Sequence, residues 1–459
     1  MVAGDKSSDK SKAKRRSSTR AIETINPNAA GIDIGSEKHY VAVSAERSET
    51  AIRTFGCYTP DLVEMAEWLR ACGVTTVAME STGVYWIPVH QVLEQHGLDV
   101  KLVDARHVKN VPGRKTDVVD CQWIQQLHSY GLLRGCFIPD AEIAALREYC
   151  RQRAGLVESS SREILHMQKS LEQMNLHLHK VLSDITGVSG MKIIRAIVSG
   201  ERSAKVLARM RDPHVKASEE EIVKALSGNY REEHLFTLEQ AVALYDVFQS
   251  KIRECDQKIE EYLNRFDDRG DPSEFEPKPK TRRKNEPHFD LDRQLYRVTG
   301  IDLTAIDGIS SLTAQTVVSE IGLDVSSFPT EKHFTSWLAL CPENRITGGK
   351  VKKRGTRKSS NRLATALRLA AQSLHRSNSA LGAFFRRIKT RHGTPKAITA
   401  TARKLACLIY RMLKYGAGYV DDGQQKYEQR YQEQQLKSLQ RRATALGYQL
   451  VSTQTGEVS

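Results

Sequence analysis

The spacing of apolar residues between positions 31 and 127 constrains the fold most strongly. Three short strand-like runs come first, at residues 31–34, 40–43 and 53–57. Consecutive strands followed by alternating helix and strand predict a mixed α/β sheet with helices packed on it. The alternating part consists of predicted helices at 59–69, 89–93 and 117–127 and predicted strands at 74–79 and 100–103.

The rest of the chain is predicted to be mainly helical. Long helical patterns at 141–185 and 237–266 have narrow apolar stripes, which suggest a helical arm or an antiparallel coiled coil. Two more helices are expected after position 360, at 361–374 and 394–415. The expected domains are a disordered basic arm (1–28), an α/β domain (29–140), a helical region (141–294) with a linker at 268–290, a basic, mainly helical domain (295–420) and a polar tail (421–459).

Positive charge is concentrated in one stretch of the chain. Residues 344–420 contain nineteen Lys and Arg and no Asp or Glu, while the whole chain has a net charge of +14. The remainder therefore carries −5 (14 minus 19). Globular domains normally mix their charges, so a stretch of one sign indicates a polyanionic partner, and we predict nucleic acid. A solvated basic face without function is the alternative.

Cysteine usage and hydropathy exclude several classes of protein. The eight cysteines are scattered singly, without a Cys-x-x-Cys pair, so a zinc knuckle or a redox site is not expected. No run of eighteen apolar residues is present, which argues against a transmembrane helix. The N-terminus has no apolar stretch of the secretory type. We expect a cytoplasmic protein that does not contact a membrane.

Two acidic residues mark the ends of predicted strands. Asp33 lies on or just past the first strand, and Glu80 follows the apolar run 74–79. Sites of open α/β sheets assemble at strand ends, so both are candidate site residues. Each has a simpler alternative. The pattern around Asp33 also opens actin-like ATPases, and Glu80 could stabilise the N-terminus of the next helix.

Asp117 and Asp120 form a second acidic pair, three residues apart at a predicted helix start. Both carboxylates then project from one face and repel each other, which a bound cation would relieve. Acids in a first helical turn are also common without any such role. Together with Asp33 and Glu80, the pair predicts a site for one or two hard cations, Mg²⁺ or Mn²⁺. Two such ions about 4 Å apart promote phosphodiester chemistry.

Four segments resemble the DEDD transposases of bacterial insertion sequences, the IS110 family. They are 31–35 (GIDIG), 79–83 (MESTG), 115–120 (KTDVVD) and 339–350 (ALCPENRITGGK), and the likeness extends through the helix from Asn361 to about residue 416. The resemblance implies a RuvC-like (ribonuclease H-like) domain, a coiled coil and a C-terminal transposase domain, in this order. It implies Mg²⁺ on Asp33, Glu80, Asp117 and Asp120. It also implies a homotetramer that recombines donor and target DNA under the guidance of a bridge RNA.

The resemblance further implies that a hydroxyl of the C-terminal domain attacks DNA and forms a covalent intermediate. The family has a Ser before a Gly here, and the matching residue is Thr347. A Thr hydroxyl can serve, although its methyl group crowds the attack. Ser359 and Ser360 are the substitutes, and a plain turn residue is the alternative for Thr347. The candidate phosphate-binding residues of this loop are Arg345, Lys350, Lys352, Lys353, Arg354, Arg357, Lys358 and Arg362.

Three other functions compete with an RNA-guided DNA transposase. A RuvC-like junction resolvase would hydrolyse DNA without a covalent step. A catalytically inactive protein would only bind DNA or RNA. An actin-like sugar kinase or ATPase needs a second phosphate-binding turn and an adenosine site in the C-terminal half, and the sequence contains neither.

Overall fold

The computed structural model describes residues 23–104, 117–276, 285–348, 350–353, 355–416 and 423–451, without the side chains of residues 117–119, 345, 346, 351 and 353. Most of the predicted basic arm (1–28) and part of the predicted linker (268–290) lie outside the described residues. The chain divides into two compact units, Met1–Ile138 and Pro139–Ser459. None of the eight cysteines, all in the described part, forms a disulfide. No helix within the described ranges is long and apolar enough to cross a membrane.

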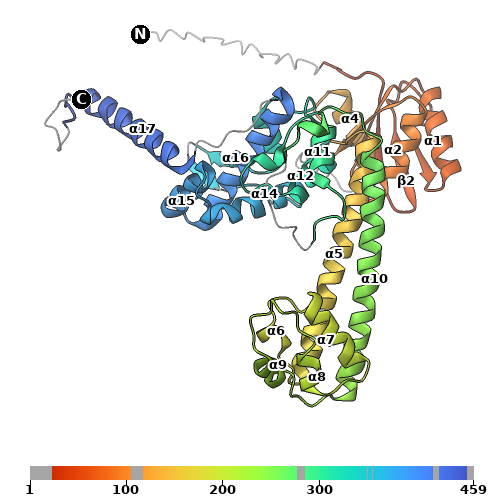
Figure 1. Cartoon of the computed structure of the whole chain (residues 1–459). Coiled ribbons are helices and arrows are strands. Elements are labelled where there is room, and N and C mark those ends of the chain that lie inside the picture. The colour runs from red at the N-terminus through yellow and green to blue at the C-terminus, as the bar shows by residue number, and fades with distance from the viewer. Residues whose placement is uncertain are drawn as a thin grey trace, which may run out of the picture. The chain divides into compact units, whose positions relative to one another are not determined.

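A five-stranded sheet forms the centre of the first unit (Figure 1). The strand order is β3-β2-β1-β4-β5; the pairs β1/β2 and β2/β3 are antiparallel, and β1/β4 and β4/β5 are parallel. The predicted mixed α/β sheet is therefore confirmed. The elements are β1 (Ala29–Ile34), β2 (Lys38–Ala42), β3 (Ile52–Gly56), α1 (Thr59–Ala71), β4 (Thr76–Glu80), α2 (Trp86–Gln95), β5 (Asp99–Val103) and α4 (Asp117–Ser129).

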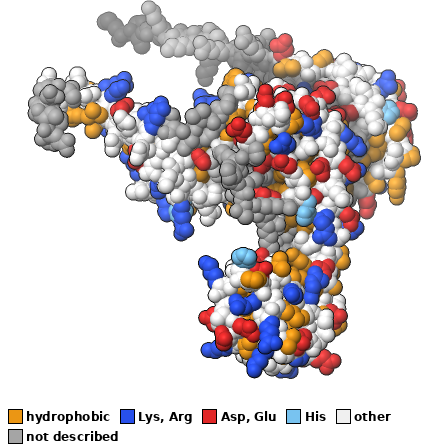
Figure 2. Space-filling model, in the orientation of Figure 1, with side chains coloured by type: hydrophobic (Ala, Val, Ile, Leu, Met, Phe, Trp, Pro, Cys, Tyr) orange, Lys and Arg blue, Asp and Glu red, His pale blue; other side chains and the backbone are white. Residues whose placement is uncertain are grey.

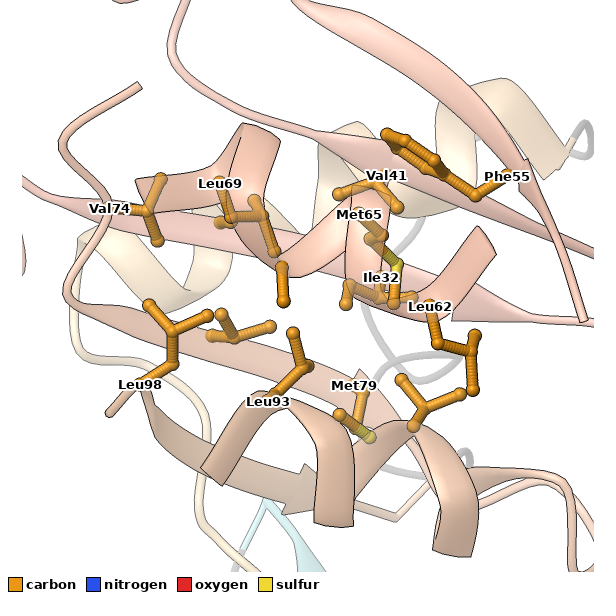
Figure 3. Packing of buried hydrophobic residues seen from close by; sticks show 14 of the residues in the cluster. Ile32, Val41, Phe55, Leu62, Met65, Leu69, Val74, Met79, Leu93 and Leu98 are labelled. Atoms are coloured by element: carbon orange, nitrogen blue, oxygen red, sulfur yellow. The ribbon is translucent and has the colours of Figure 1, made fainter. Parts of the chain in front are cut away.

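The larger apolar core lies on one face of this sheet. Successive side chains of a strand point to opposite faces, so Ile32 and Met79 share the core face. Leu62 and Met65 of α1 and Leu93 of α2 pack against them (Figure 3). Because these side chains are almost fully buried, the two helices hold β1 and β4 firmly in register.

Helix α4 packs on the opposite face. Its Ile124 joins Ala78 and Val103 in a smaller buried cluster. Near its end, the His128 ring contacts Thr76 Oγ1 at 2.9 Å, and burial lowers the pKa of His128 to about 4. His128 therefore stays neutral at pH 7 and anchors α4 to β4.

The closest approach between α4 and the sheet occurs at Gly31. A Cβ atom at this position would lie 2.2 Å from the Gln125 nitrogen and 2.4 Å from the Cys121 carbonyl oxygen. Both are backbone atoms of α4, which cannot move aside individually. The glycine therefore sets how near α4 lies to β1, the strand that carries Asp33.

We expect Gly31→Ala to destabilise the first unit by about 1–3 kcal/mol or more, because the methyl group would push α4 away from β1. Thermal melting of the full chain, followed by circular dichroism, measures this loss. Gly155→Ala is the matched control: no atom lies within 4 Å of its added Cβ, so this helix-interior change should stabilise by up to about 1 kcal/mol. Equal melting of Gly31→Ala and the parent would refute the close-packing argument.

Two long antiparallel helices begin the second unit, α5 (Ala141–Gln173) and α10 (Glu232–Leu263) (Figure 1). Their polar contacts include Gln249 Nε2 donating to Ser160 Oγ at 2.9 Å. Arg153 and Asp256 form a buried ion pair between the two helices. Removing one partner of such a pair would leave a buried, uncompensated charge, so shifting one helix along the other would be unfavourable.

Four short helices fold against one end of this pair (Figure 1). Their apolar side chains share a core with Met167 of α5 and Leu238 of α10. The prediction of one helix from 141 to 185 was wrong here, since α5 ends at Gln173 and Asn175 has a φ of 58°. The short helices are α6 (Leu178–Val181), α7 (Val188–Val198), α8 (Ala204–Ala208) and α9 (Glu219–Ala225).

The remainder of the second unit is also mostly helical. Ion pairs from Arg147 and Arg151 to Glu320 tie α12 to α5. The elements are the 3-10 turns η1 (Pro272–Glu274), η2 (Leu303–Ala305) and η3 (Leu374–Arg376), helices α11 (Leu291–Thr299), α12 (Ser311–Ile321), α13 (Glu331–Trp337), α14 (Arg362–Ser373), α15 (Ala380–His392), α16 (Thr394–Tyr415) and α17 (Gly423–Ala445), and strands β6 (Arg345–Thr347) and β7 (Lys350–Lys353).

α15 and α17 are two of the helices here that were not predicted. α15 has Gly382 in its first turn and basic residues through its second half, so the apolar positions Leu381 and Phe385 give only a weak helical pattern. α17 lies in the segment expected to be a polar tail, and it contacts α15 through Arg387, whose guanidinium lies 4.0 Å from the centre of the Tyr431 ring. Cation–π contacts of this kind have no signature in the apolar periodicity of a sequence.

Candidate nuclease site and nucleic-acid interface

The two predicted strand acids lie on neighbouring strands. β1 and β4 are parallel, with Ile32 opposite Met79 at the end of the paired stretch. One residue further along, Asp33 of β1 and Glu80 of β4 come side by side. Since Ile32 and Met79 face the larger core, alternation places both acids on the opposite face, the face of α4. Both residues are partly buried.

Helix α4 brings a third acid to this face. Cys121 of α4 is buried, and burial raises its pKa to about 11, with smaller contributions from the negative charges of Asp33 and Asp120. Asp120 directly precedes Cys121, whose carbonyl oxygen closely approaches Gly31 of β1, two residues before Asp33. Asp33 and Asp120 therefore belong to the part of the unit where α4 meets β1. Asp120 is partly buried. Asp117 is the first residue of α4, and its side chain is outside the described ones.

No three His, Cys, Asp or Glu side chains among the described residues form a ready-made metal-binding group. Asp33, Glu80 and Asp120 thus share a face of the sheet without a complete set of ligands around one point. The fourth predicted ligand, Asp117, takes no part in this comparison because its side chain is not described. All four predicted ligands would bind through carboxylate oxygens, which are the donor atoms that a hard cation prefers.

Asp104 is an acid that the sequence analysis missed. It directly follows β5, the strand beside β4, so it lies at the same edge of the sheet as Glu80. Asp104 is exposed, and its charge adds to burial in raising the pKa of the Cys136 thiol. The sequence signal that identified Glu80, an acid directly after an apolar strand, could also have identified Asp104.

Thr347 lies in the second unit, next to the turn of a β-hairpin. The segment that we predicted to be a basic loop forms the two-stranded sheet β6/β7, in which Thr347 pairs with Lys350. Thr347 is exposed, and Gly348 follows it with a φ of 56°, a conformation that glycine adopts without strain. The loop prediction failed because both strands are very short and Arg or Lys fills four of their seven positions.

Most of the predicted phosphate-binding residues are exposed on or near this hairpin, namely Lys350, Lys352, Arg357, Lys358 and Arg362. The side chains of Arg345 and Lys353 and the whole of Arg354 lie outside the described residues. Of the two substitute nucleophiles, Ser359 accepts a hydrogen bond from the Asn361 N–H at 3.1 Å, and both serines are exposed. The exposed Lys and Arg residues thus form a positively charged, solvent-exposed surface that extends from the hairpin to the start of α14.

An α/β unit with acids on adjacent strands, followed by a mostly helical unit with a basic surface, fits a protein that acts on nucleic acid. Two family models match: a DEDD model of the IS110 group, described as Transposase, covers residues 30–176, and one described as Transposase IS116/IS110/IS902 family covers 302–386. Together they span just over half of the chain, which therefore belongs to the IS110 family of transposases. The matched ranges include all four acids and Thr347. No curated protein matches the chain.

Proposed function

We propose that this transposase is an RNA-guided DNA recombinase with a RuvC-like catalytic domain. In this proposal the first unit supplies four metal-binding acids, and the second supplies a nucleophilic hydroxyl and a basic surface for DNA and a guide RNA. The active form is a homotetramer, as the family implies. The observation that carries the proposal is that Asp33 and Glu80 lie on neighbouring parallel strands, on the face of the sheet that α4, the helix of Asp120, covers.

The topology of the sheet supports the RuvC-like assignment. Three antiparallel strands continue into two parallel ones, and the first strand, β1, occupies the centre. This order places the end of β1 beside the end of β4, so an acid on each strand serves one site. Helix α4 packs directly over β1, on the face of the sheet where Asp33 and Glu80 lie, and α4 carries Asp120.

The acids would hold one or two Mg²⁺ or Mn²⁺ ions. A bound divalent ion there would activate the attacking oxygen and stabilise the leaving oxygen in phosphodiester cleavage. Partial burial of Asp33, Glu80 and Asp120 fits this role, since the side chains can reach solvent while α4 and the sheet restrict their motion. Gly31 and His128 would have no chemical role in this site. They position α4 against β1 and β4.

Thr347 would be the nucleophile. Its hydroxyl is exposed at the end of β6, and Lys350 lies across from it on β7. A lysine at this place can stabilise the negative charge that develops on an attacked phosphate. The bond formed is Thr347 Oγ1 to phosphorus, and the bond broken is the phosphodiester bond to the departing strand, whose oxygen takes up a proton.

The first test uses the full chain with labelled DNA that spans the ends of the mobile element encoding it. We expect strand cleavage in Mg²⁺, no cleavage with a chelator, and a protein–DNA adduct on denaturing electrophoresis. Cleavage without an adduct would favour a junction resolvase, and binding without cleavage would favour an inactive binding protein. Sequencing the RNA that co-purifies with the protein tests the guide. A random RNA population would contradict the RNA-guided part.

The basic hairpin gives a quantitative prediction. Replacing Lys352, Lys353 and Arg357 with Ala should weaken binding to all DNA sequences alike, because phosphate contacts carry no sequence information. Each lost contact should reduce the slope of log affinity against log salt by about one unit. Fluorescence anisotropy at several salt concentrations measures this slope. A triple variant with an unchanged slope would assign the hairpin some other role.

A further inference from the structure

A large groove lies in the second unit beside the hairpin. It has a volume of about 830 Å³, which is within the range of pockets that enclose an organic ligand. Helix α15 and helix α16 form most of its walls, and the two ends of the hairpin segment close one side through Pro342 and Thr356. Its apolar lining residues are Leu340, Pro342, Phe384, Ile388, Pro395, Ala400 and Leu408.

The charged residues of the groove are all basic. Lys396, Arg403, Lys404 and Arg411 contribute to the lining, and no Asp or Glu does. Glu331 pairs with Arg411 at 2.7 Å and so neutralises one of the four. Lys396 is exposed. An apolar lining with a surplus of cations suits a ligand that has flat apolar groups joined by negative charges.

The groove is continuous with the segment that carries Thr347. Pro342 and Thr356 form a β-bridge at the base of the segment, and the Glu343 N–H donates to the Gly355 carbonyl at 2.7 Å. Thr347 lies five residues after Pro342, so the chain places it at most about 18 Å from the groove. A DNA strand covers such a distance within a few nucleotides.

Two cationic side chains contact the Phe384 ring, which lines the groove. Lys404 Nζ lies 4.8 Å from the centre of the Phe384 ring, and Arg387 lies 5.4 Å from the same ring. Figure 2 shows further Lys and Arg side chains on the visible surface of the segment that carries α15 and α17. A phosphate entering here would meet cations that are held in place by these rings, and a base would meet the neighbouring aliphatic surface.

We propose that this groove holds unpaired bases of the DNA strand that Thr347 attacks. The bases leave the duplex and rest on the apolar lining between α15 and α16, while Lys396 and Arg403 contact the adjoining phosphates. This assignment rests on the proposed function of Thr347 and extends it, since the groove fixes the strand on one side of the attacked phosphate. Continuity with the Thr347 segment favours the DNA strand over the guide RNA or an acidic helix of a protein.

The test compares binding to labelled strands of about twelve nucleotides: oligo-dT, the matching oligo-dT/oligo-dA duplex and oligo-U RNA. A chelator is present throughout, so the result does not depend on catalysis. Ala400→Trp fills the groove from α16 and should weaken oligo-dT binding about tenfold, because the bases lose their apolar surface. Duplex binding should change less than about twofold, since the exposed phosphate-binding residues remain.

Leu369→Trp is the matched control. Leu369 is exposed on α14 and does not line the groove, so this variant should bind all three probes like the parent. Photocrosslinking of oligo-dT that contains iododeoxyuridine should label peptides of α15 and α16. The proposal is overturned if Ala400→Trp binds oligo-dT normally, if it loses duplex binding equally, or if only oligo-U binding falls. If oligo-dT binds in the groove but the separate cleavage assay in Mg²⁺ yields no Thr347 adduct, the proposed nucleophile is refuted and the groove assignment remains.

Discussion

DNA strand cleavage should be lost when any one of the four acids is neutralised without a change of shape. The variants are Asp33→Asn, Glu80→Gln, Asp117→Asn and Asp120→Asn. Each removes a negative charge from the proposed metal site and keeps the size of the side chain. Loss of an outer-shell partner alone costs about 10–100-fold in metal affinity or activity, so loss of a direct ligand should cost at least about a hundredfold. Single-turnover cleavage of labelled DNA in Mg²⁺ measures the rate.

Glu37→Gln is the matched control for these variants. Glu37 is an exposed acid in the connection from β1 to β2, close to Asp33 in the sequence and outside the four family acids. It should cleave at the parent rate. All five variants should bind DNA normally, because the cationic residues of the interface belong to the second unit. A variant such as Asp120→Asn that cleaves at the parent rate would remove that residue from the site.

Asp104→Asn adds a further comparison. Asp104 shares the strand-end position of Glu80 on the neighbouring strand, but it was not among the predicted ligands. If proximity to the strand ends were sufficient, its loss would reduce cleavage as much as the loss of Glu80. We expect a smaller effect, because Asp104 lies two strands away from β1 whereas Glu80 lies beside it.

The sequence predicted the first unit well because strand and helix patterns there follow burial. The strands at 31–34 and 100–103 face an apolar core or are covered by helices, so their composition reports their structure directly. Glu80 was expected just after β4 and is instead its last residue, a shift that periodicity alone cannot resolve. Its predicted place beside Asp33 depends on β1 and β4 being neighbours, which was visible only in the sheet order.

Sequence reasoning failed where polar contacts determine the structure. The strands of hairpin β6/β7 are three and four residues long, and each has one strongly apolar residue, Ile346 or Val351, so the alternation is too short to detect. Helix α17 has no fully buried residue, and the rings of its Tyr427 and Tyr431 make cation–π contacts with Arg387 of α15. The groove between α15 and α16 was equally invisible, since its lining comes from segments that are far apart in the chain.

Thr347→Ala should abolish the covalent protein–DNA adduct, which is the largest effect expected for a single change in the second unit. The variant lacks the only oxygen that this side chain could use for attack. Removing a nucleophile typically reduces the rate by several orders of magnitude, so we expect no adduct above background. DNA binding should be unchanged, because Thr347 is neutral and exposed and Gly348 keeps the turn. Denaturing electrophoresis of the protein with labelled DNA and Mg²⁺ separates the adduct from bound DNA.

Thr347→Ser provides the rescue that separates a chemical role from a structural one. It restores the hydroxyl that the family carries at this position and removes the methyl group that crowds the attacked phosphorus. We expect adduct formation at least as fast as in the parent, whereas Thr347→Val, which keeps the shape without the hydroxyl, should be as inactive as Thr347→Ala. Ser359→Ala and Ser360→Ala are the controls, since both serines are exposed in the same basic segment. An adduct that persists in Thr347→Ala and disappears in one of these serine variants would move the nucleophile to that serine.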